Sequence, residues 1–307
     1  MRHQHHLTPK SKLIAIIGQT ASGKSSLAIE IARQRDGIVL SLDSLSIYKK
    51  IDIASAKPSL EERDEIDHFG IDIVYPDEPF SVSDFIDIYK EAEAHASSSG
   101  KNLIIAGGSS FYLKILLSGI SPLPKISGNT AKTVEELMKN TTEAYRYLKT
   151  IAPEHSLSIS PSDRYRIEKS LLIAIETGLA PDEYFKSNPP IPIISSEIDI
   201  YETVIAKEEL KERVARRTKN MIERGLIDEV ASLEYEYGRF PKPMKSIGIK
   251  EVLDYFDGLY GVDTMEEKIN INTMRLAKRQ RTFNRTQFEN LFRGSVKDLE
   301  REILSVL

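Results

Sequence analysis

The sequence predicts an α/β fold in which helices flank a parallel sheet and a small all-helical domain is inserted into the core. Short apolar runs alternate with amphipathic stretches from residue 13 to residue 118, which is the pattern of a parallel sheet. A segment rich in Gly and Pro follows at 118–129, and helical periodicity then continues to residue 177. A strand-like run at 199–205 returns the chain to the sheet.

These transitions divide the chain into three stretches. We expect residues 1–120 to form the first part of the core, residues 121–192 to form the helical insertion, and residues 193–307 to complete the core with basic carboxyl-terminal helices. A chain of 307 residues is long enough for one large core and a second, smaller unit.

The composition excludes several classes of protein. The chain contains no cysteine, so disulfides, thiolate metal sites and cysteine nucleophiles are excluded. No apolar run approaches the length of a membrane span. Residues 1–12 are polar and His-rich and lack the apolar region of a signal peptide. We therefore expect a cytoplasmic protein that does not bind membranes.

The most informative stretch begins with the apolar run Leu13–Ile17, which predicts a buried parallel strand. The next eight residues match the pattern GxxxxGK[ST] of a P-loop, and an amphipathic helix follows them. These residues are Gly18, Gln19, Thr20, Ala21, Ser22, Gly23, Lys24 and Ser25. A strand before the motif and a helix after it give the motif its functional context. The sequence therefore predicts a P-loop NTPase-like core.

We expect this loop to bind a di- or triphosphate. Gly18 and Gly23 allow a tight turn that exposes amide hydrogens, and these amides attract phosphate together with the positive end of the following helix. Lys24 adds a positive charge, and the Ser25 hydroxyl is placed to coordinate Mg²⁺, the cofactor that we predict. A glycine-rich turn without a ligand is the alternative, and the complete motif argues against it.

Two further strands are expected to end at the same edge of the sheet. The run at 38–42 is followed by Asp43, and the run at 103–106 is followed by Gly107. Ligands bind at the carboxyl edge of such sheets, and a carboxylate there can accept a proton from an incoming nucleophile. A lone Asp after a strand is often only a helix cap, but the neighbouring P-loop favours a catalytic role. A short strand at 71–74 and a helix at 83–99 are also expected.

Helices are expected to dominate the end of the chain, at about 207–224, 226–236, 248–257, 264–290 and 296–306. The net charge of −4 argues by itself against a nucleic-acid partner. The charge is uneven, however, because residues 273–285 contain several Lys and Arg residues and no acid. A basic helix of this kind is either solvated surface or a contact for phosphate groups.

An ordered set of short motifs between about residue 13 and residue 292 resembles the tRNA dimethylallyltransferases, the bacterial tRNA isopentenyltransferase family. Besides the P-loop, the matching stretches are Asp43–Tyr48, Ala54–Pro58, Gly107–Tyr112, Asp163–Ile167, Arg217–Leu226, Ile247–Glu251 and Ala277–Phe283. Many families share the P-loop, whereas the whole set in this order is specific. The chain departs from the family pattern at Gln19, Ser25, Ser46, Asp67, Ser110 and Phe283.

The resemblance implies transfer of a dimethylallyl group from dimethylallyl diphosphate to N6 of the adenosine 3′-adjacent to the anticodon, in tRNAs that read codons starting with U. Pyrophosphate is then the leaving group. The resemblance implies catalytic roles for Lys24, Ser25, Asp43 and Arg217, with Asp43 as the general base and Arg217 on the pyrophosphate. Arg213 lies one helical turn before Arg217 and is a weaker candidate for the same role.

The partners implied by the resemblance are dimethylallyl diphosphate and the anticodon stem-loop of tRNA, bound by a monomer, with the helical insertion in contact with the tRNA. The residues expected to bind tRNA are Asp43, Ser44, Leu45, Ser46, Lys57, Ser109, Asp163, Arg166, Ile167, Lys245, Lys250, Lys278, Arg279, Gln280, Arg281, Phe283 and Arg285. Lys278, Arg281 and Arg285 recur at i, i+3 and i+7 and therefore share a helix face. We expect Phe283 to lie off that face.

Three other functions remain open on the sequence. A P-loop kinase of a small alcohol or nucleoside would use Asp43 to activate a hydroxyl group, but it explains neither the basic helix nor the insertion. An adenylate isopentenyltransferase would use the same donor on a free nucleotide and needs no RNA surface. A non-catalytic RNA-binding module is disfavoured because Lys24, Ser25, Asp43 and Arg217 are all present.

Overall fold

The computed structural model describes residues 11–195 and 198–307, which form two compact units. Unit 1 comprises the chain up to Lys114 and from Ser196 onward, and unit 2 comprises Ile115–Ser195. Most of the segment on which the expectation of no signal peptide rests lies outside the described residues. Within the described ranges, no helix is long and apolar enough to cross a membrane.

Unit 1 is built on one parallel sheet, and its fold class is the predicted one. The strands of the described residues are arranged in the order β3-β2-β4-β1-β5-β6, and neighbouring strands pair in parallel. Their bounds are β1 Leu13–Gly18, β2 Gly37–Ser41, β3 His68–Phe69, β4 Asn102–Gly107, β5 Asp199–Thr203 and β6 Phe292–Gly294. Because β1 lies between β4 and β5, the P-loop that follows it lies at the middle of the carboxyl edge of the sheet.

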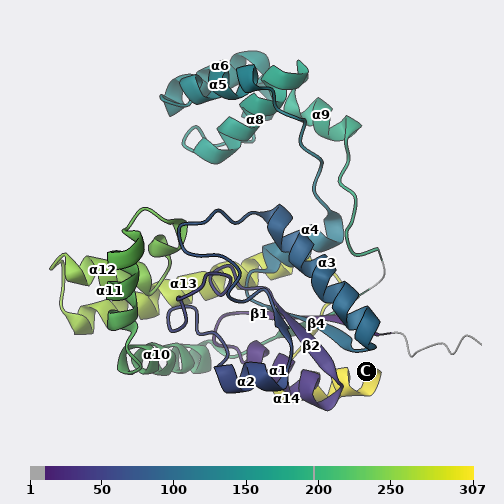
Figure 1. Ribbon diagram of the computed structural model, residues 1–307, viewed down its shortest axis with the longest axis vertical. Coiled ribbons are helices and arrows are strands. Elements are labelled where there is room, and N and C mark those ends of the chain that lie inside the picture. The colour runs from purple at the N-terminus through teal and green to yellow at the C-terminus, as the bar shows by residue number, and fades with distance from the viewer. Residues whose placement is uncertain (1–10, 196–197) are drawn as a thin grey trace, which may run out of the picture. The chain divides into compact units, whose positions relative to one another are not determined.

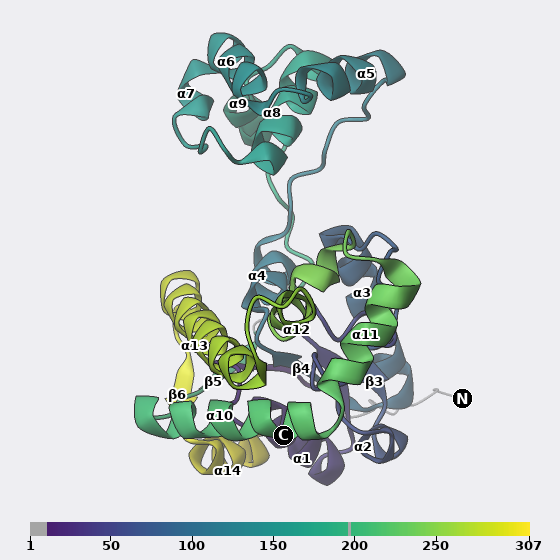
Figure 2. The ribbon, with the colours of Figure 1, turned by 90° about the vertical axis from the view of Figure 1, so that its left-hand side faces the viewer.

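Helices cover both faces of this sheet. Helix α1 (Lys24–Gln34) and helix α14 (Val296–Val306) pack on one face, while α3 (Val82–Ser99) lies over the other (Figure 1). The first segment of unit 1 ends within the next helix, α4 (Ser110–Ser118), whose Tyr112 stacks on Phe85 of α3. The remaining helices of unit 1 are α2 Leu60–Glu65, α10 Lys207–Glu223, α11 Leu226–Tyr237, the 3₁₀ turn η1 Lys242–Lys245, α12 Ile249–Phe256 and α13 Val262–Gln287. Helix α13 packs against α10 (Figure 2). The helix that contains the basic stretch 273–285 therefore lies beside the helix that carries Arg217.

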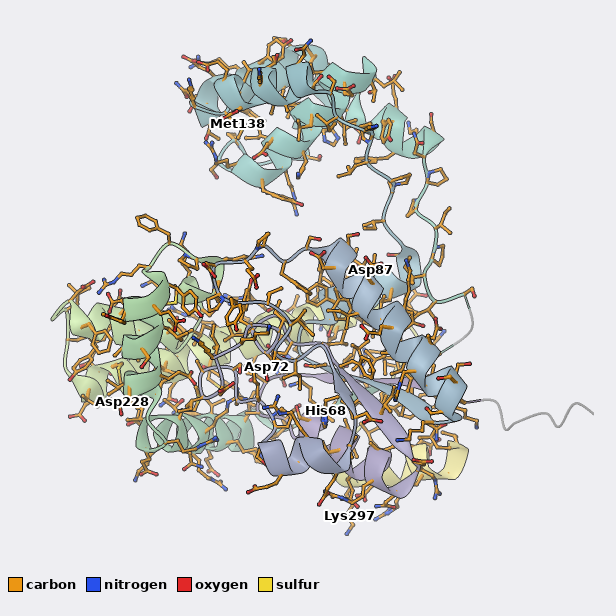
Figure 3. The ribbon with its side chains drawn as sticks, viewed as in Figure 1. His68, Asp72, Asp87, Met138, Asp228 and Lys297 are labelled. Atoms are coloured by element: carbon orange, nitrogen blue, oxygen red, sulfur yellow. The ribbon has the colours of Figure 1, made fainter. Side chains whose placement is uncertain are left out.

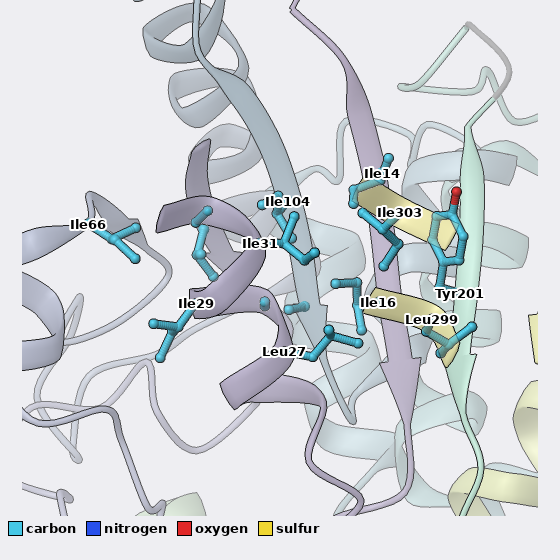
Figure 4. Packing of buried hydrophobic residues seen from close by; sticks show 14 residues of the cluster. Ile14, Ile16, Leu27, Ile29, Ile31, Ile66, Ile104, Tyr201, Leu299 and Ile303 are labelled. Atoms are coloured by element: carbon cyan, nitrogen blue, oxygen red, sulfur yellow. The ribbon is translucent and has the colours of Figure 1, made fainter. Parts of the chain in front are cut away.

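The apolar runs of the sequence form the core on which the site is mounted. Ile14 and Ile16 of β1 pack against Leu27 of α1 and against Leu299 and Ile303 of α14 (Figure 4). All five are at most 3% exposed. Burying a side chain of this kind contributes about 1.5–3 kcal/mol. This packing holds β1 and α1, and therefore the loop between them, in one arrangement.

Unit 2 is all-helical and has its own core. Its helices are α5 Gly128–Leu137, α6 Thr141–Ile151, α7 Pro153–Ser156, α8 Arg164–Thr177 and α9 Pro181–Ser187. Val134, Leu148 and Leu171 from three of these helices pack together and are buried. Side chains that accept backbone hydrogen bonds cap α5, α6 and α8. Unit 2 therefore folds around helix packing that needs no strand.

One prediction about secondary structure is wrong, and one expected helix is confirmed with an earlier end. The expected strand at 71–74 forms only an isolated bridge between Val74 and Tyr48, and β3 forms earlier, at His68–Phe69. The expected helix at 264–290 ends at Gln287, and β6 follows as the edge strand beside β5. The reason is tertiary: the ring of Phe292 stacks on that of Tyr201 of β5 at 5.2 Å, and this contact has no local sequence signature.

Candidate active site

The carboxyl edge of the sheet in unit 1 opens into a cavity of about 650 Å³. Segments that are distant in sequence line it: the P-loop, the ends of β2 and β4, the loop 54–58, one face of α10, residues 245–247 and one face of α13. This volume is ordinary for a site that binds a small molecule. The cavity therefore brings together most of the positions that the sequence marks as functional.

The P-loop is held in place by β5. Ser22 and Thr203 share a hydrogen bond of 2.6 Å between their hydroxyl oxygens. At Gly18 the strand approaches so closely that an added Cβ would lie 2.2 Å from Oγ1 of Thr203. Gly23 has φ +91°, a left-handed conformation that other residues adopt only with strain. Both glycines of the motif are thus required by the geometry of the loop.

Lys24 is a buried positive charge without an acidic partner among the described residues. Its side chain lines the cavity, and its ammonium group donates to the carbonyl of Gln19 at 3.1 Å. The pKa of Lys24 is lowered to about 8, chiefly by burial and in part by the nearby Arg217, while the charge of Asp43 opposes the shift. An anion bound in the cavity would relieve this cost, because an opposite charge favours the protonated form.

Asp43 has a structural role that leaves half of its carboxylate available. Its Oδ1 accepts hydrogen bonds from the backbone amides of Leu45 at 2.8 Å and Ser46 at 3.3 Å. No described group donates a hydrogen bond to its Oδ2, and the residue lines the cavity. The alternative expected from the sequence, a helix cap, is not what forms, because the carboxylate caps a turn. This capping uses one oxygen and is compatible with a catalytic role for the other.

Arg217 lies beside the P-loop, as the motif match implies. One nitrogen of its guanidinium donates to the hydroxyl of Thr20 at 3.2 Å, and the residue lines the cavity. Burial lowers the pKa of Arg217, and the charge of Asp43 counteracts part of this shift. Arg213 pairs with Glu209 at 2.7 Å and does not line the cavity. An added Cβ at Gly23 would lie 3.5 Å from Nη1 of Arg213, so this arginine borders the outside of the same loop.

Helix α13 presents two different faces. Arg279, Gln280 and Phe283 line the cavity, at the spacing of one helix face. Lys278, Arg281 and Arg285 are exposed and do not line it. The three-residue basic face and the position of Phe283 off that face agree with the expectation. The cavity-lining position of Arg279 is additional information, because it separates this arginine from its basic neighbours.

Two glutamines join α13 to the phosphate loop. Gln280 accepts from the amide of Thr20 at 2.8 Å and donates to the carbonyl of Gly108 at 3.0 Å. Gln19 donates to the carbonyl of Ala277 at 3.0 Å. The sequence marks Gln280 for RNA, and it marks Gln19 as a member of the phosphate-binding loop and as a departure from the family pattern. Their actual partners are more than 170 residues away in the chain, so no local pattern reveals them.

Lys57 requires a correction, because its ammonium group is already saturated. Its side chain is 2% exposed and donates to Asp52 at 2.7 Å, to Asp72 at 2.6 Å and to the carbonyl of Tyr48 at 2.7 Å (Figure 3 labels Asp72). An ammonium group has three donors, and all three are used. Lys57 therefore holds together the loop 51–58, called the cavity loop below, instead of contacting RNA phosphate.

In unit 2, Ile167 also requires a correction. It is completely buried in the core with Leu148 and Leu171, so its side chain cannot touch RNA. Asp163 caps α8 by accepting from the amide of Arg166 at 3.1 Å, whereas the side chain of Arg166 is exposed. The motif Asp163–Ile167 is therefore partly structural, and its exposed member is Arg166.

The other expected RNA contacts fall into two groups. Ser44, Leu45, Ser46, Ser109 and Lys245 line the cavity. Lys250 lies outside it, is exposed and pairs with Asp254 at 2.8 Å. Sequence reasoning missed Thr203, described above, and Glu229. Both carboxylate oxygens of Glu229 accept backbone amides of residues 52–54, which fixes the cavity loop on α11.

Known proteins are similar to this chain over most of its length. A protein-family model described as IPP transferase matches residues 46–287. A tRNA dimethylallyltransferase of Sulfurovum sp. is 51% identical over 291 residues, which is 95% of this chain and 97% of the relative. The tRNA dimethylallyltransferase of Helicobacter pylori (strain ATCC 700392 / 26695) is 44% identical over 97% of this chain and 94% of its own length.

Solved structures give the same result. A tRNA isopentenylpyrophosphate transferase from Staphylococcus epidermidis has a TM-score of 0.67 and 28% identity, covering 97% of this chain and 98% of that one. A eukaryotic dimethylallyltransferase acting on tRNA has a TM-score of 0.76 and 26% identity, covering 89% of this chain and 70% of that one. The similarity therefore extends over both units of the chain.

Proposed function

This chain belongs to the tRNA dimethylallyltransferase family, and we propose that it transfers a dimethylallyl group from dimethylallyl diphosphate to N6 of an adenosine in tRNA. We further propose that this adenosine is 3′-adjacent to the anticodon in tRNAs that read codons starting with U. In this proposal the enzyme acts in the cytoplasm as a monomer on the anticodon stem-loop. The observation that carries the proposal is the shared cavity of the P-loop, Arg217, Asp43 and the inner face of α13.

The donor diphosphate would bind in the P-loop. Thr20 and Ser25 of the loop, Lys24 with its ammonium group and Arg217 with its guanidinium line the same cavity. Each of these groups would interact more strongly with pyrophosphate as the bond to carbon breaks and charge develops on oxygen. In this proposal the loop stabilises pyrophosphate as the leaving group, and no phosphoryl group is transferred.

Asp43 would act as the general base. The N6 nitrogen of adenosine attacks C1 of the dimethylallyl group, the C1–O bond breaks, and the electron pair leaves with pyrophosphate. The proton of N6 passes to the carboxylate of Asp43, whose Oδ2 has no partner among the described residues. An exocyclic amine is a weak nucleophile, so orientation in the cavity contributes as well.

The residues fit Mg²⁺ as a cofactor. Mg²⁺ usually keeps several waters and is bound through one or two protein ligands and substrate phosphates. The Ser25 hydroxyl lines the cavity beside Lys24 and would supply such a ligand. The described residues contain no group of three or more His, Asp or Glu side chains that could hold a metal. When bound, Mg²⁺ would help to neutralise the charge of pyrophosphate.

RNA would contact the helix α13 and the exposed part of unit 2. Arg279 and Phe283 line the cavity and would meet the nucleotide that enters it, because aromatic rings and guanidinium planes stack on unpaired bases. Lys278, Arg281 and Arg285 would contact phosphates, and Arg166 of unit 2 is exposed for the same purpose. The target base must leave its stack to reach the cavity.

The substitution Asp43→Asn tests the proposal. It keeps the oxygen that accepts from Leu45 and Ser46 but removes the base, so we expect transfer to slow by about 10²–10⁴-fold in single-turnover assays. Binding of dimethylallyl diphosphate is expected to persist. The companion Asp43→Ala also loses the turn, and an Asn variant as fast as wild type would refute the role of Asp43.

Substrate assays separate the proposal from its alternatives. Labelled dimethylallyl diphosphate is incubated with bulk tRNA, with AMP and with no acceptor, and ATP is tested with small alcohols and nucleosides. Incorporation into tRNA alone is expected. Incorporation into AMP would indicate an adenylate isopentenyltransferase, and phosphoryl transfer from ATP would indicate a kinase.

A further inference from the structure

The loop that connects α11 to η1 holds an aromatic ring out in solvent. Phe240 in this loop is 95% exposed, although a phenyl ring in water forgoes the gain that burial would bring. Isolated exposed apolar residues are common on protein surfaces and need no explanation. Phe240 differs from such a residue in the rigidity, the charge and the position of its loop.

The loop is fixed on both sides of Phe240. On one side, Arg239 forms ion pairs with Glu234 of α11 and with Asp257 after α12, the second at 2.7 Å. On the other side, Pro241 begins the turn that leads into η1, and its carbonyl accepts from the amide of Met244 at 3.1 Å. Phe240 is therefore presented to solvent by an ordered backbone.

Positive charge accompanies the ring. Lys242 and Lys245 follow it on η1, both are exposed, and neither forms an ion pair within the described ranges. This sets them apart from Arg239 and Lys250, which are paired with acids. Unpaired lysines beside an exposed aromatic ring are the combination that binds single-stranded nucleic acid, since the lysines meet phosphates and the ring stacks on a base.

The loop ends at the cavity. Lys245 and the two residues after it line the cavity wall. Phe240 is five residues before Lys245: η1 covers the last three steps at about 2 Å each, and two steps of extended chain at about 3.3 Å each precede it, so the separation is at most roughly 13 Å. An RNA loop that inserts one base into the cavity would therefore place a flanking base within reach of Phe240.

We propose that Phe240 stacks on an unpaired base that flanks the target adenosine. Lys242 and Lys245 then contact the phosphates that link this base to the adenosine. This inference rests on the proposed function, because it takes tRNA as the substrate. It adds a recognition element outside the cavity and outside the basic helix α13. Bases in RNA loops are accessible to such stacking because they are not held in a helix.

Binding of unmodified tRNA to Phe240→Ala tests the inference. Loss of one stacked base should weaken the affinity by about 5- to 150-fold. The dependence of the affinity on salt should keep its slope, because no charge is removed. Phe240→Trp should bind like wild type, and Phe240→Leu should bind like Phe240→Ala, since leucine is apolar but cannot stack. The double change Lys242→Ala with Lys245→Ala should reduce the slope by about 1.4, at 0.7 per phosphate contact.

Tyr235→Ala is the matched control. Tyr235 is also 95% exposed, but it lies on α11, which contributes no residue to the cavity. Its loss should leave tRNA affinity unchanged. Wild-type affinity in Phe240→Ala, an equal loss in Tyr235→Ala, or wild-type affinity in Phe240→Leu would each overturn the inference. A change in sedimentation of Phe240→Ala without RNA would overturn it too, by indicating self-association through this ring.

The inference and the proposed function fail in different ways. If wild type does not modify tRNA, the proposed function fails before any variant is made. If wild type modifies tRNA and Phe240→Ala binds it normally, only the inference fails. Thermal unfolding of each variant should match wild type, because substitutions at an exposed site rarely change stability by more than about 0.5 kcal/mol.

Discussion

The P-loop and the loop 51–58 each place a buried lysine on the wall of the same cavity, and the two lysines differ in their partners. Counted over the whole residue, Lys24 and Lys57 are both 8% exposed. Lys24 has one carbonyl partner and a pKa lowered to about 8, first by burial. Lys57 has two carboxylates and a carbonyl. The comparison shows that burial alone does not identify a binding lysine; the number of unsatisfied donors does.

Asp72 shows what full pairing does to the surroundings of Lys57. Partial burial works to raise the pKa of Asp72, but hydrogen bonds from Lys57 and Arg63 hold it below its ordinary value. Charge in this loop is thus balanced within the protein. Near Lys24 the balance is incomplete, because Arg217 adds a second positive charge and Asp43 supplies the nearby negative one. A bound diphosphate would complete it.

The largest expected effect is on catalysis. Lys24→Met removes the unpaired charge, so we expect transfer to fall by about 10²–10³-fold, the usual loss for one donor to a developing anion. Single-turnover rates measure it. The matched variant Lys57→Met should reduce the rate much less, since Lys57 has no free donor. Equal losses in both variants would erase the distinction between the two loops.

The second expected effect is on stability and has the opposite sign in the two loops. Lys57→Met leaves Asp52 and Asp72 without their shared partner, and breaking a fully buried pair costs about 3–5 kcal/mol. Asp52 is 60% exposed and Asp72 keeps Arg63, so we expect roughly 2 kcal/mol. Lys24→Met should instead raise the free energy of unfolding in the absence of substrate, because it removes a buried charge.

Urea unfolding of both variants at pH 7 checks these two signs. Wild type is the reference, and far-UV circular dichroism reports the folded fraction. If Lys57→Met is as stable as wild type, the ion pairs of Lys57 are not stabilising. If Lys24→Met is less stable than wild type, the charge of Lys24 is better satisfied than its single hydrogen bond implies.

The smallest expected effect, taken per pH unit, is a dependence of the free energy of unfolding on pH. The pKa of Lys24 is lowered in the folded state from 10.5 to about 8, so between these values the unfolded chain binds more protons than the folded one. The free energy of unfolding of wild type should therefore rise with pH across this window, by up to about 1.4 kcal/mol per pH unit. The advantage of Lys24→Met should shrink accordingly. Unfolding curves of both proteins from pH 7.5 to 10 measure this difference, and a constant gap would contradict the shift.

Much of the fold and the phosphate site could be predicted because their determinants are local. About twenty residues contain the run Leu13–Ile17, the glycines of the P-loop and the following amphipathic helix. The spacing of their apolar residues and the positions of their glycines directly indicate a strand, a tight turn and a helix. Asp43 was found in the same way, as the residue after a strand at a known edge. Ile167 was misassigned because a motif match does not report which of its residues are buried.

The remaining features depend on pairs of residues that only the tertiary structure brings together. Gln280 contacts Thr20 across 260 positions, Phe292 of an edge strand that no periodicity predicts stacks on Tyr201, and Glu229 holds a loop more than 170 residues earlier. Which of two buried lysines keeps a free donor was settled in the same way. The physical reason is that hydrogen bonds and burial depend on distance in space, whereas a sequence pattern records only distance along the chain.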